Sequence, residues 1–169
     1  MDKGADDNYE AALYELNIKT RHIQQKVSNI HFSSDFSYLM SKNAVLFSMN
    51  ANKKPTISKL NLDTNIIEAI TDGETPVWYS DIEFIYQNGN VIYMYNIREK
   101  TSKKLREGFF IGVPSISPNK KFMVYKSLFP KYGEARDILF IASINENWIK
   151  NVDLEEVLEY YPYNVQWVQ

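Results

Sequence analysis

With 44% hydrophobic and 24% charged residues, the 169-residue chain has the composition of a globular protein, and its formal charge of −2 disfavours a dedicated nucleic-acid binder. The absence of Cys excludes disulfide scaffolds, thiolate metal sites and Cys nucleophiles, and no apolar run approaches the roughly 18–20 residues that span a bilayer. Aromatic residues make up 14% of the chain and only 6 residues are Gly, which favours β-strands joined by Asn, Asp and Ser turns.

The N-terminus, Met1–Asn8 (MDKGADDN), lacks the basic start and apolar core of a signal peptide. We expect residues 1–11 to be a flexible leader before one domain at 12–169, because polar termini are usually loose. The alternative is a mature extracytoplasmic segment whose signal has been removed. The absence of Cys fits export, so an extracytoplasmic or secreted location is favoured over a cytoplasmic one.

A hairpin pattern recurs along the chain, with an apolar run, a polar turn and a second alternating run in each copy. The copies are Leu13–Lys26, Ile57–Ile70, Ile92–Leu105 and, more weakly, Leu139–Val152. Their turn residues are Asn17, Asn61, Asn96 and Ser143, at intervals of 44, 35 and 47 residues. This interval is typical of four-stranded blades, of which each hairpin would be the outer half. The repeat therefore predicts a strand at Tyr9–Leu16, although Ala11-Ala12 would suit a helix.

A second element lies between the hairpins: two short apolar strands joined by a tight polar turn. Its copies are Phe36–Asn50, Val77–Gln87 and Pro114–Ser127. Met40, Trp78 and Ile116 precede the three turns at even intervals of 38 residues. For the first copy this spacing favours a turn at 41–43 over the alternative at 33–35. Asn88-Gly89 then predicts a further hairpin turn.

The third of these copies resembles the blades of TolB-type and dipeptidyl-peptidase-type β-propellers. It reads ISPNKKFMVY from Ile116 to Tyr125, where the family has Ser-Pro-Asp-Gly-Lys before an apolar strand. Asn119 stands in place of the family's Asp and Lys120 in place of its Gly, and the other two copies lack the Pro. The resemblance covers residues 12–169 and implies an all-β, propeller-like array.

The repeats predict three full four-stranded blades and one partial blade. Tyr163–Val168 (YNVQWV) repeats the inner-strand pattern, with Trp167 in the place of Trp78 and Ile116. The chain is then either part of a longer propeller or a four-bladed ring. We expect the last strand to pair with the segment Tyr9–Leu16 or with a second polypeptide, because an open sheet edge promotes association.

One short helix is predicted near residues 153–160. Asp153 and Glu156 have capping-box spacing, the apolar residues of Asp153–Glu159 fall on one face, and Pro162 ends the run.

No catalytic, metal or cofactor motif is present in the sequence. The two His, His22 and His31, are too few for a metal site, which needs three or four ligands. Asn61–Asn65 has oxygen ligands that calcium would accept, but it also occupies a repeated turn. We therefore expect no catalytic residues, no metal and no cofactor, and a protein that is not an enzyme.

Aromatic residues are more numerous than packing obviously demands. They are explained by an inter-blade core or by a contact surface, since Tyr and Trp are enriched at binding hot spots. The candidate binding residues are Tyr160, Tyr161, Tyr163, Trp167, Trp78, Tyr93 and Tyr95. The favoured function is a non-catalytic protein-binding or scaffold module whose partner is another protein or a second copy. The alternatives are a truncated propeller accessory to a hydrolase or peptidase, and a sugar- or ligand-binding propeller.

Overall fold

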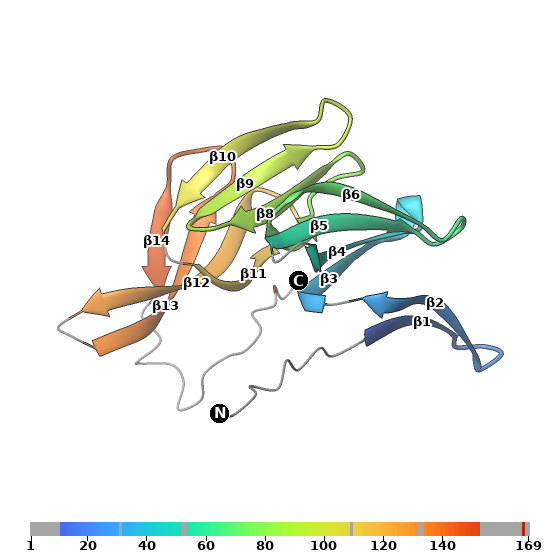
Figure 1. The fold of residues 1–169 in the computed structure, drawn as a ribbon. Helices are drawn as coiled ribbons and strands as arrows, with labels where there is room; N and C mark the ends of the chain where they lie inside the picture. The colour runs from blue at the N-terminus through green and yellow to red at the C-terminus, as the bar shows by residue number, and fades with distance from the viewer. Residues whose placement is uncertain are drawn as a thin grey trace, which may run out of the picture. The chain divides into compact units, whose positions relative to one another are not determined.

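The computed structural model describes residues 11–30, 32–51, 54–108, 110–131, 134–152 and 167 (Figure 1). These residues form antiparallel β-strands and one short 3-10 turn, Met40–Lys42. The chain divides into two compact units, residues 1–74 and 75–169, which are described separately. No helix in the described ranges has the length and apolar character needed to cross a membrane.

The first unit contains a two-stranded hairpin and a four-stranded sheet. The hairpin strands are β1 (Ala11–Asn17) and β2 (His22–Ile30). The sheet strands, in spatial order, are β3 (Phe32–Leu39), β4 (Ala44–Ala51), β5 (Lys54–Asn61) and β6 (Ile66–Asp72). The predicted strand before Asn17 is confirmed, and the predicted turn after Met40 lies between β3 and β4. The alternative turn at 33–35 is wrong, because those residues lie within β3.

The second unit contains two four-stranded sheets. The strands of one are β7 (Glu74–Trp78), β8 (Glu83–Asn88), β9 (Val91–Asn96) and β10 (Thr101–Glu107). The strands of the other are β11 (Phe110–Ile116), β12 (Phe122–Lys131), β13 (Glu134–Ser143) and β14 (Ile149–Val152).

The predicted hairpin between β8 and β9 is confirmed, with a positive φ of 57° at Gly89. The described residues thus form three four-stranded blades and one partial blade, as the repeats predict. The predicted helix at 153–160 and strand at 163–168 lie outside the described residues, apart from Trp167.

The repeated Asn explains why the hairpin pattern recurs. The Asn residues concerned are Asn17, Asn61 and Asn96. The side-chain oxygen of each accepts hydrogen bonds of 2.9–3.1 Å from the backbone N–H groups two and three residues later. The residue four positions after each Asn has a φ of 55–57°. In the weaker fourth copy, the Ser143 hydroxyl accepts one such bond, from the Glu146 N–H at 3.1 Å.

Asn96→Ala is expected to lower the free energy of unfolding by about 1–2 kcal/mol, because two turn hydrogen bonds each contribute roughly 0.5–1.5 kcal/mol. Urea unfolding followed by circular dichroism measures this change. Asn96→Asp keeps the acceptor oxygen and should remain close to the parent protein. Equal stability of the Ala variant and the parent would show that the side chain does not hold the turn.

Candidate functional site

In each copy of the hairpin pattern, the residue directly before the Asn or Ser of the turn shows which face of the blade packs against another blade. In the second unit, Ala142 on β13 packs with Ile85 and Ile92 of the preceding sheet. In the first unit, Leu60 on β5 packs with Leu13 and Val27 of the preceding hairpin. Ala142 and Leu60 are both 0% exposed. In each case this position therefore points toward the blade that comes earlier in the chain.

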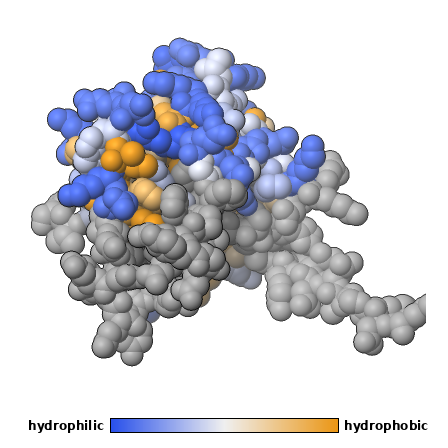
Figure 2. Space-filling model, turned by 90° about the vertical axis from the view of Figure 1, so that its left-hand side faces the viewer, coloured by the Kyte–Doolittle hydropathy of each residue, from blue (hydrophilic) through white to orange (hydrophobic). Residues whose placement is uncertain are grey.

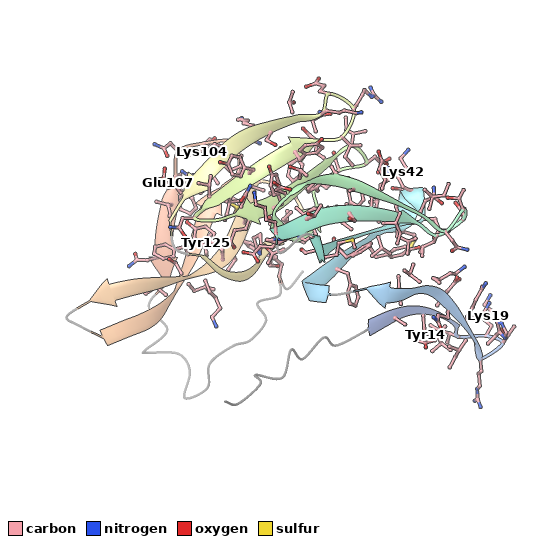
Figure 3. All side chains as sticks on the ribbon, in the orientation of Figure 1. Tyr14, Lys19, Lys42, Lys104, Glu107 and Tyr125 are labelled. Carbon is pink, nitrogen blue, oxygen red and sulfur yellow. The ribbon has the colours of Figure 1, made fainter. Side chains whose placement is uncertain are left out.

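Leu16 holds the same position before Asn17 in the first hairpin, but it is 57% exposed. The antiparallel register pairs Leu16 with Ile23 and Tyr14 with Gln25, so these side chains share one face. Tyr14 and Ile23 are also more than half exposed. We call Tyr14, Leu16 and Ile23 the open hairpin face. Figure 3 shows Tyr14 on this hairpin and Lys19 at its turn.

The opposite face of the hairpin covers only part of its neighbouring sheet. Leu13 and Val27 pack against Val45 and Phe47 of β4 and against β5. On β3, Phe36 is paired with Phe47 and therefore lies on that same sheet face, yet it is 63% exposed. Tyr38, which is paired with Val45, is also more than half exposed, as is Met40 in the following turn. The apolar surface of the first unit thus continues along β3.

The predicted aromatic residues of the β7–β10 sheet come together in one cluster. Tyr95 lies 5.1 Å from Phe84 between ring centroids, and Tyr93 stacks on Tyr86 at 5.4 Å. Trp78 meets Phe84 edge-on at 6.2 Å. Tyr95 is 8% exposed, whereas Trp78 and Tyr93 are half-buried. This geometry is that of packed side chains, with only part of Trp78 and Tyr93 reaching the surface.

Trp167 is the one residue of the predicted C-terminal cluster that the structure describes. It is half-buried, and its indole Nε1 donates a hydrogen bond of 3.3 Å to the Ser115 carbonyl oxygen in β11. Ser115 directly precedes Ile116, the residue whose repeat position Trp167 shares. Tyr160, Tyr161 and Tyr163 lie outside the described residues.

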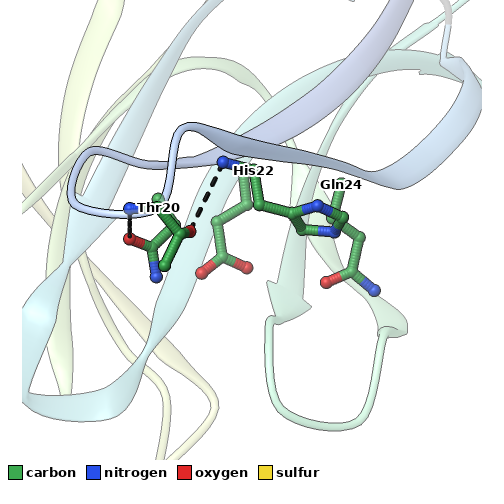
Figure 4. Close-up of a pocket in the computed structure, with 5 residues that line it drawn as sticks. Thr20, His22 and Gln24 are labelled. Atoms are coloured by element: carbon green, nitrogen blue, oxygen red, sulfur yellow. Dashed lines mark hydrogen bonds between the residues drawn. The ribbon is translucent and has the colours of Figure 1, made fainter.

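A polar pocket of about 420 Å³ lies on the first hairpin (Figure 4). It is lined by Glu15, Asn17, Thr20, His22 and Gln24. Glu15 is already paired with Lys26 at 2.8 Å, and Asn17 caps the turn. No group of three or more His, Asp or Glu that could hold a metal occurs in the part of the chain that the structure describes.

Arg106 ties the two sheets of the second unit together. Its guanidinium donates to the Asn147 side-chain oxygen at 2.8 Å and to the backbone carbonyls of Ser143, Glu146 and Trp148 at 2.8–3.1 Å. A register shift between Lys104 and Arg106 places Arg106 opposite Ile92, on the face that packs against the other sheet. The β-bulge thus re-aims the Arg side chain, which the alternating pattern alone would not predict.

Among the described residues of this unit, three side chains have shifted pKa values. Lys104 donates a hydrogen bond to the Glu107 carboxylate on the same strand (Figure 3), which raises the pKa of Lys104 and lowers the pKa of Glu107. Burial in the core between the two sheets raises the pKa of the Tyr125 hydroxyl. None of these shifts produces a group that titrates unusually near neutral pH.

Figure 2 shows one side of the molecule, where most of the described surface is hydrophilic and the apolar surface is limited to small areas. Exposed apolar side chains of the second unit include Trp148, directly before β14, and Ile149, its first residue. Trp148 meets Phe122 edge-on at 5.8 Å and is therefore partly packed. The more extensive apolar surface among the described residues is the one built by the hairpin and β3.

The fold is that of part of a β-propeller of the TolB and peptidase type. The chain is similar to TolB from Acinetobacter baumannii, with 19% identity and a TM-score of 0.69 over 83% of this chain and 37% of that chain. It is also similar to a putative TolB from Agrobacterium tumefaciens, with 8% identity and a TM-score of 0.62 over 76% of this chain and 51% of that chain. The β-propeller domain of the trilobed protease from Pyrococcus furiosus matches at 11% identity and a TM-score of 0.57, over 88% of this chain and 51% of that chain.

These matches confirm the resemblance inferred from the blade motif. The chain spans 37% and 51% of the lengths of the two TolB chains. No protein-family model and none of the curated proteins compared with the sequence matches it.

Two features of the candidate site were missed by sequence reasoning, namely the open hairpin face and the exposed side chains of β3. A usable signal did exist for the first, because Leu16 precedes its turn residue just as Leu60 does and the two positions could have been compared.

Proposed function

We propose that this chain is a non-catalytic protein-binding module built from a partial propeller. The observation that carries the proposal is the exposure of Leu16. Its side chain is 57% exposed, whereas Leu60, at the same position of the repeat, is 0% exposed. An exposed apolar face of this kind is typical of an interaction surface. The similarity of fold does not by itself indicate a function, because TolB and the propeller domains of peptidases have the same fold.

The surface has the composition of a contact site. The open hairpin face presents one Tyr and two large aliphatic side chains, and β3 adds Phe36 and Tyr38, which are 63% and 52% exposed. Aromatic anchors of this kind contribute most of the binding energy at protein interfaces. Burying one such side chain removes roughly 150–250 Å² from water. The face therefore supports binding of a polypeptide partner.

A photo-crosslinking amino acid at position 16, introduced in the cells that make the protein, tests this function. The expected result is a covalent adduct with a polypeptide that is absent when the same amino acid stands at position 66. Ile66 is a suitable control because it is 63% exposed but lies on β6, away from the open hairpin face. Equal crosslinking at both positions, or none at either, would contradict the proposed function.

A further inference from the structure

We propose that β1 binds an extended segment of a partner polypeptide as an added antiparallel strand, and that this segment carries an apolar, an aliphatic and an aromatic residue in succession. The inference rests on the proposed function and gives the chemistry of its partner. The contact surface is the edge of β1 opposite β2, together with Tyr14 and Leu16 of the open hairpin face.

By its place in the repeat, β1 corresponds to a strand that has a neighbour on each side. Its equivalents β5, β9 and β13 each pair with two strands, whereas β1 pairs with β2 alone within the described residues. Sheet edges that face solvent are normally short or carry Lys or Pro. β1 has 7 residues, and its one charged side chain, Glu15, is paired with Lys26. It therefore has the character of a strand that accepts a second neighbour.

The three strands that pair with the equivalent edge share one pattern. Each contains an apolar, an aliphatic and an aromatic residue in succession, all of them at most 5% exposed. The first residue pairs with the position of Leu16, and the third pairs with the position of Tyr14. The register of the repeat thus defines which side chains an added strand brings to the open hairpin face. The three runs are Val45-Leu46-Phe47 on β4, Phe84-Ile85-Tyr86 on β8 and Met123-Val124-Tyr125 on β12.

Tyr14 holds the position at which two of the complete blades form a cross-strand aromatic pair. Tyr93 stacks on Tyr86 at 5.4 Å between ring centroids, and Phe140 stacks on Tyr125 at 5.6 Å. Aromatic pairs are among the contacts that stabilise antiparallel strands. Because Tyr14 is 56% exposed, its ring can stack on the aromatic residue of the added strand.

A backbone hydrogen bond of the repeat also has a place in the hairpin. In the complete blades, the N–H of the residue after the Asn or Ser of the turn donates to a carbonyl at 2.8–3.0 Å. The accepting residues, Asn43, Ile82 and Lys121, each lie two positions before the apolar run. Ile18 is the equivalent donor, and its N–H has no backbone acceptor among the described residues. A strand added in the same register would supply this carbonyl group.

Charge at the turn favours an acidic residue two positions before the run. In the first complete blade, the Asn43 side chain at that position donates a hydrogen bond of 2.6 Å to Asp63. Lys19 is the equivalent of Asp63, since each lies two residues after the Asn of its turn. Lys19 is exposed and forms no ion pair with any described residue. A carboxylate in the place of Asn43 would therefore complement Lys19.

Binding of a short peptide to the purified full-length chain tests this proposal. The probe is a labelled synthetic peptide of residues 41–51 with the substitution Asn43→Asp, because β4 carries the run in the required register. Fluorescence anisotropy should give saturable binding with a Kd on the order of 100 µM or tighter. The further substitution Phe47→Ser in the peptide should weaken binding roughly tenfold, because the ring that meets Tyr14 is lost. A Kd above about 1 mM for the probe, or equal binding of the two peptides, would overturn the proposal.

A charge exchange tests the position of the acidic residue. Lys19→Glu should weaken binding of the Asn43→Asp peptide roughly threefold and should bind an Asn43→Lys peptide more tightly than the Asn43→Asp peptide. Arg98→Glu, at the equivalent position of the β9–β10 turn, is the matched control and should bind like the parent. Both are exposed turn residues, so neither substitution is expected to unfold the chain. The same peptide preference in the parent and in Lys19→Glu would overturn the assigned position.

Disulfide formation measures the register directly, since the chain contains no Cys. Leu16→Cys should react faster with a Val45→Cys peptide than with a Phe47→Cys peptide, and Tyr14→Cys should show the opposite preference. Directly opposed residues of antiparallel strands lie closer together than diagonal ones. Equal rates for the two peptides would overturn the proposed register.

The crosslinking experiment separates this proposal from the proposed function. A polypeptide adduct at position 16 in cells, combined with no binding of the peptides, would refute strand addition and keep the protein-binding function. Peptide binding in the proposed register without any adduct in cells would support the strand-accepting edge and contradict the proposed function.

Discussion

Replacing Phe84 by Ala is expected to lower the free energy of unfolding by about 3–5 kcal/mol, the range for deletion of a buried Phe side chain. Phe84 is 0% exposed and is surrounded by three other aromatic rings, those of Trp78, Tyr86 and Tyr95. Its loss removes apolar burial and leaves a cavity among rigid rings that collapse poorly into it. Urea unfolding followed by tryptophan fluorescence measures the change.

Phe36→Ala is the matched control for this substitution. It deletes the same side chain from β3, where Phe36 is 63% exposed. We expect a change below about 1 kcal/mol, since little burial is lost. Similar losses for the two variants would show that the aromatic cluster of the β7–β10 sheet is not a core.

Arg106→Ala is expected to lower the free energy of unfolding by about 2–4 kcal/mol. The substitution removes charge-assisted hydrogen bonds to three carbonyl groups and one side-chain amide. A hydrogen bond to a charged group contributes roughly 1.5–3 kcal/mol net. The total stays below the sum of four such bonds because the two hydrogens of one nitrogen, Nη2, are shared among the three carbonyl groups. Because these acceptors lie at the end of β13 and in the loop that connects it to β14, exchange of the amide hydrogens there should also accelerate. Hydrogen-exchange mass spectrometry measures this local effect.

Two further variants show whether geometry or charge matters at this position. Arg106→Lys keeps the charge but lacks the planar fork of donors, so its stability should fall between those of the parent and Arg106→Ala. Arg98→Ala removes an exposed Arg from the neighbouring turn and should change stability by less than about 0.5 kcal/mol. If Arg106→Ala behaves like Arg98→Ala, the guanidinium does not hold the two sheets together.

The blades could be predicted from the sequence because their signals are local. Asn17, Asn61 and Asn96 each bond to N–H groups within three residues, so the turn is encoded where it forms. The alternation of apolar and polar residues on either side then fixes the strands. Even the degraded motif around Pro118 correctly indicated the turn between β11 and β12.

The exposure of individual side chains could not be predicted in the same way. Leu16 and Leu60 have the same local pattern, but Leu60 is buried against Leu13 and Val27 of the hairpin whereas Leu16 is 57% exposed. Tertiary contacts, and not the local sequence, decide this difference in burial. The role of Arg106 depends on a register shift after Lys104, which no local pattern encodes. The surplus of Tyr is compatible with a core or with a contact surface, and the sequence does not show that Tyr95, a candidate binding residue, is only 8% exposed.

Thiol labelling at position 16 tests the central claim most directly, because the chain contains no Cys and a single introduced thiol reports on its own site. Leu16→Cys and Ile66→Cys would be labelled with a maleimide in the purified protein and in the cells that make the protein. The account predicts that labelling of Leu16→Cys, measured relative to labelling of Ile66→Cys, is slower in cells, where a polypeptide partner covers the open hairpin face. An equal ratio of the two labelling rates in both settings would contradict the assignment of the open hairpin face as the contact site.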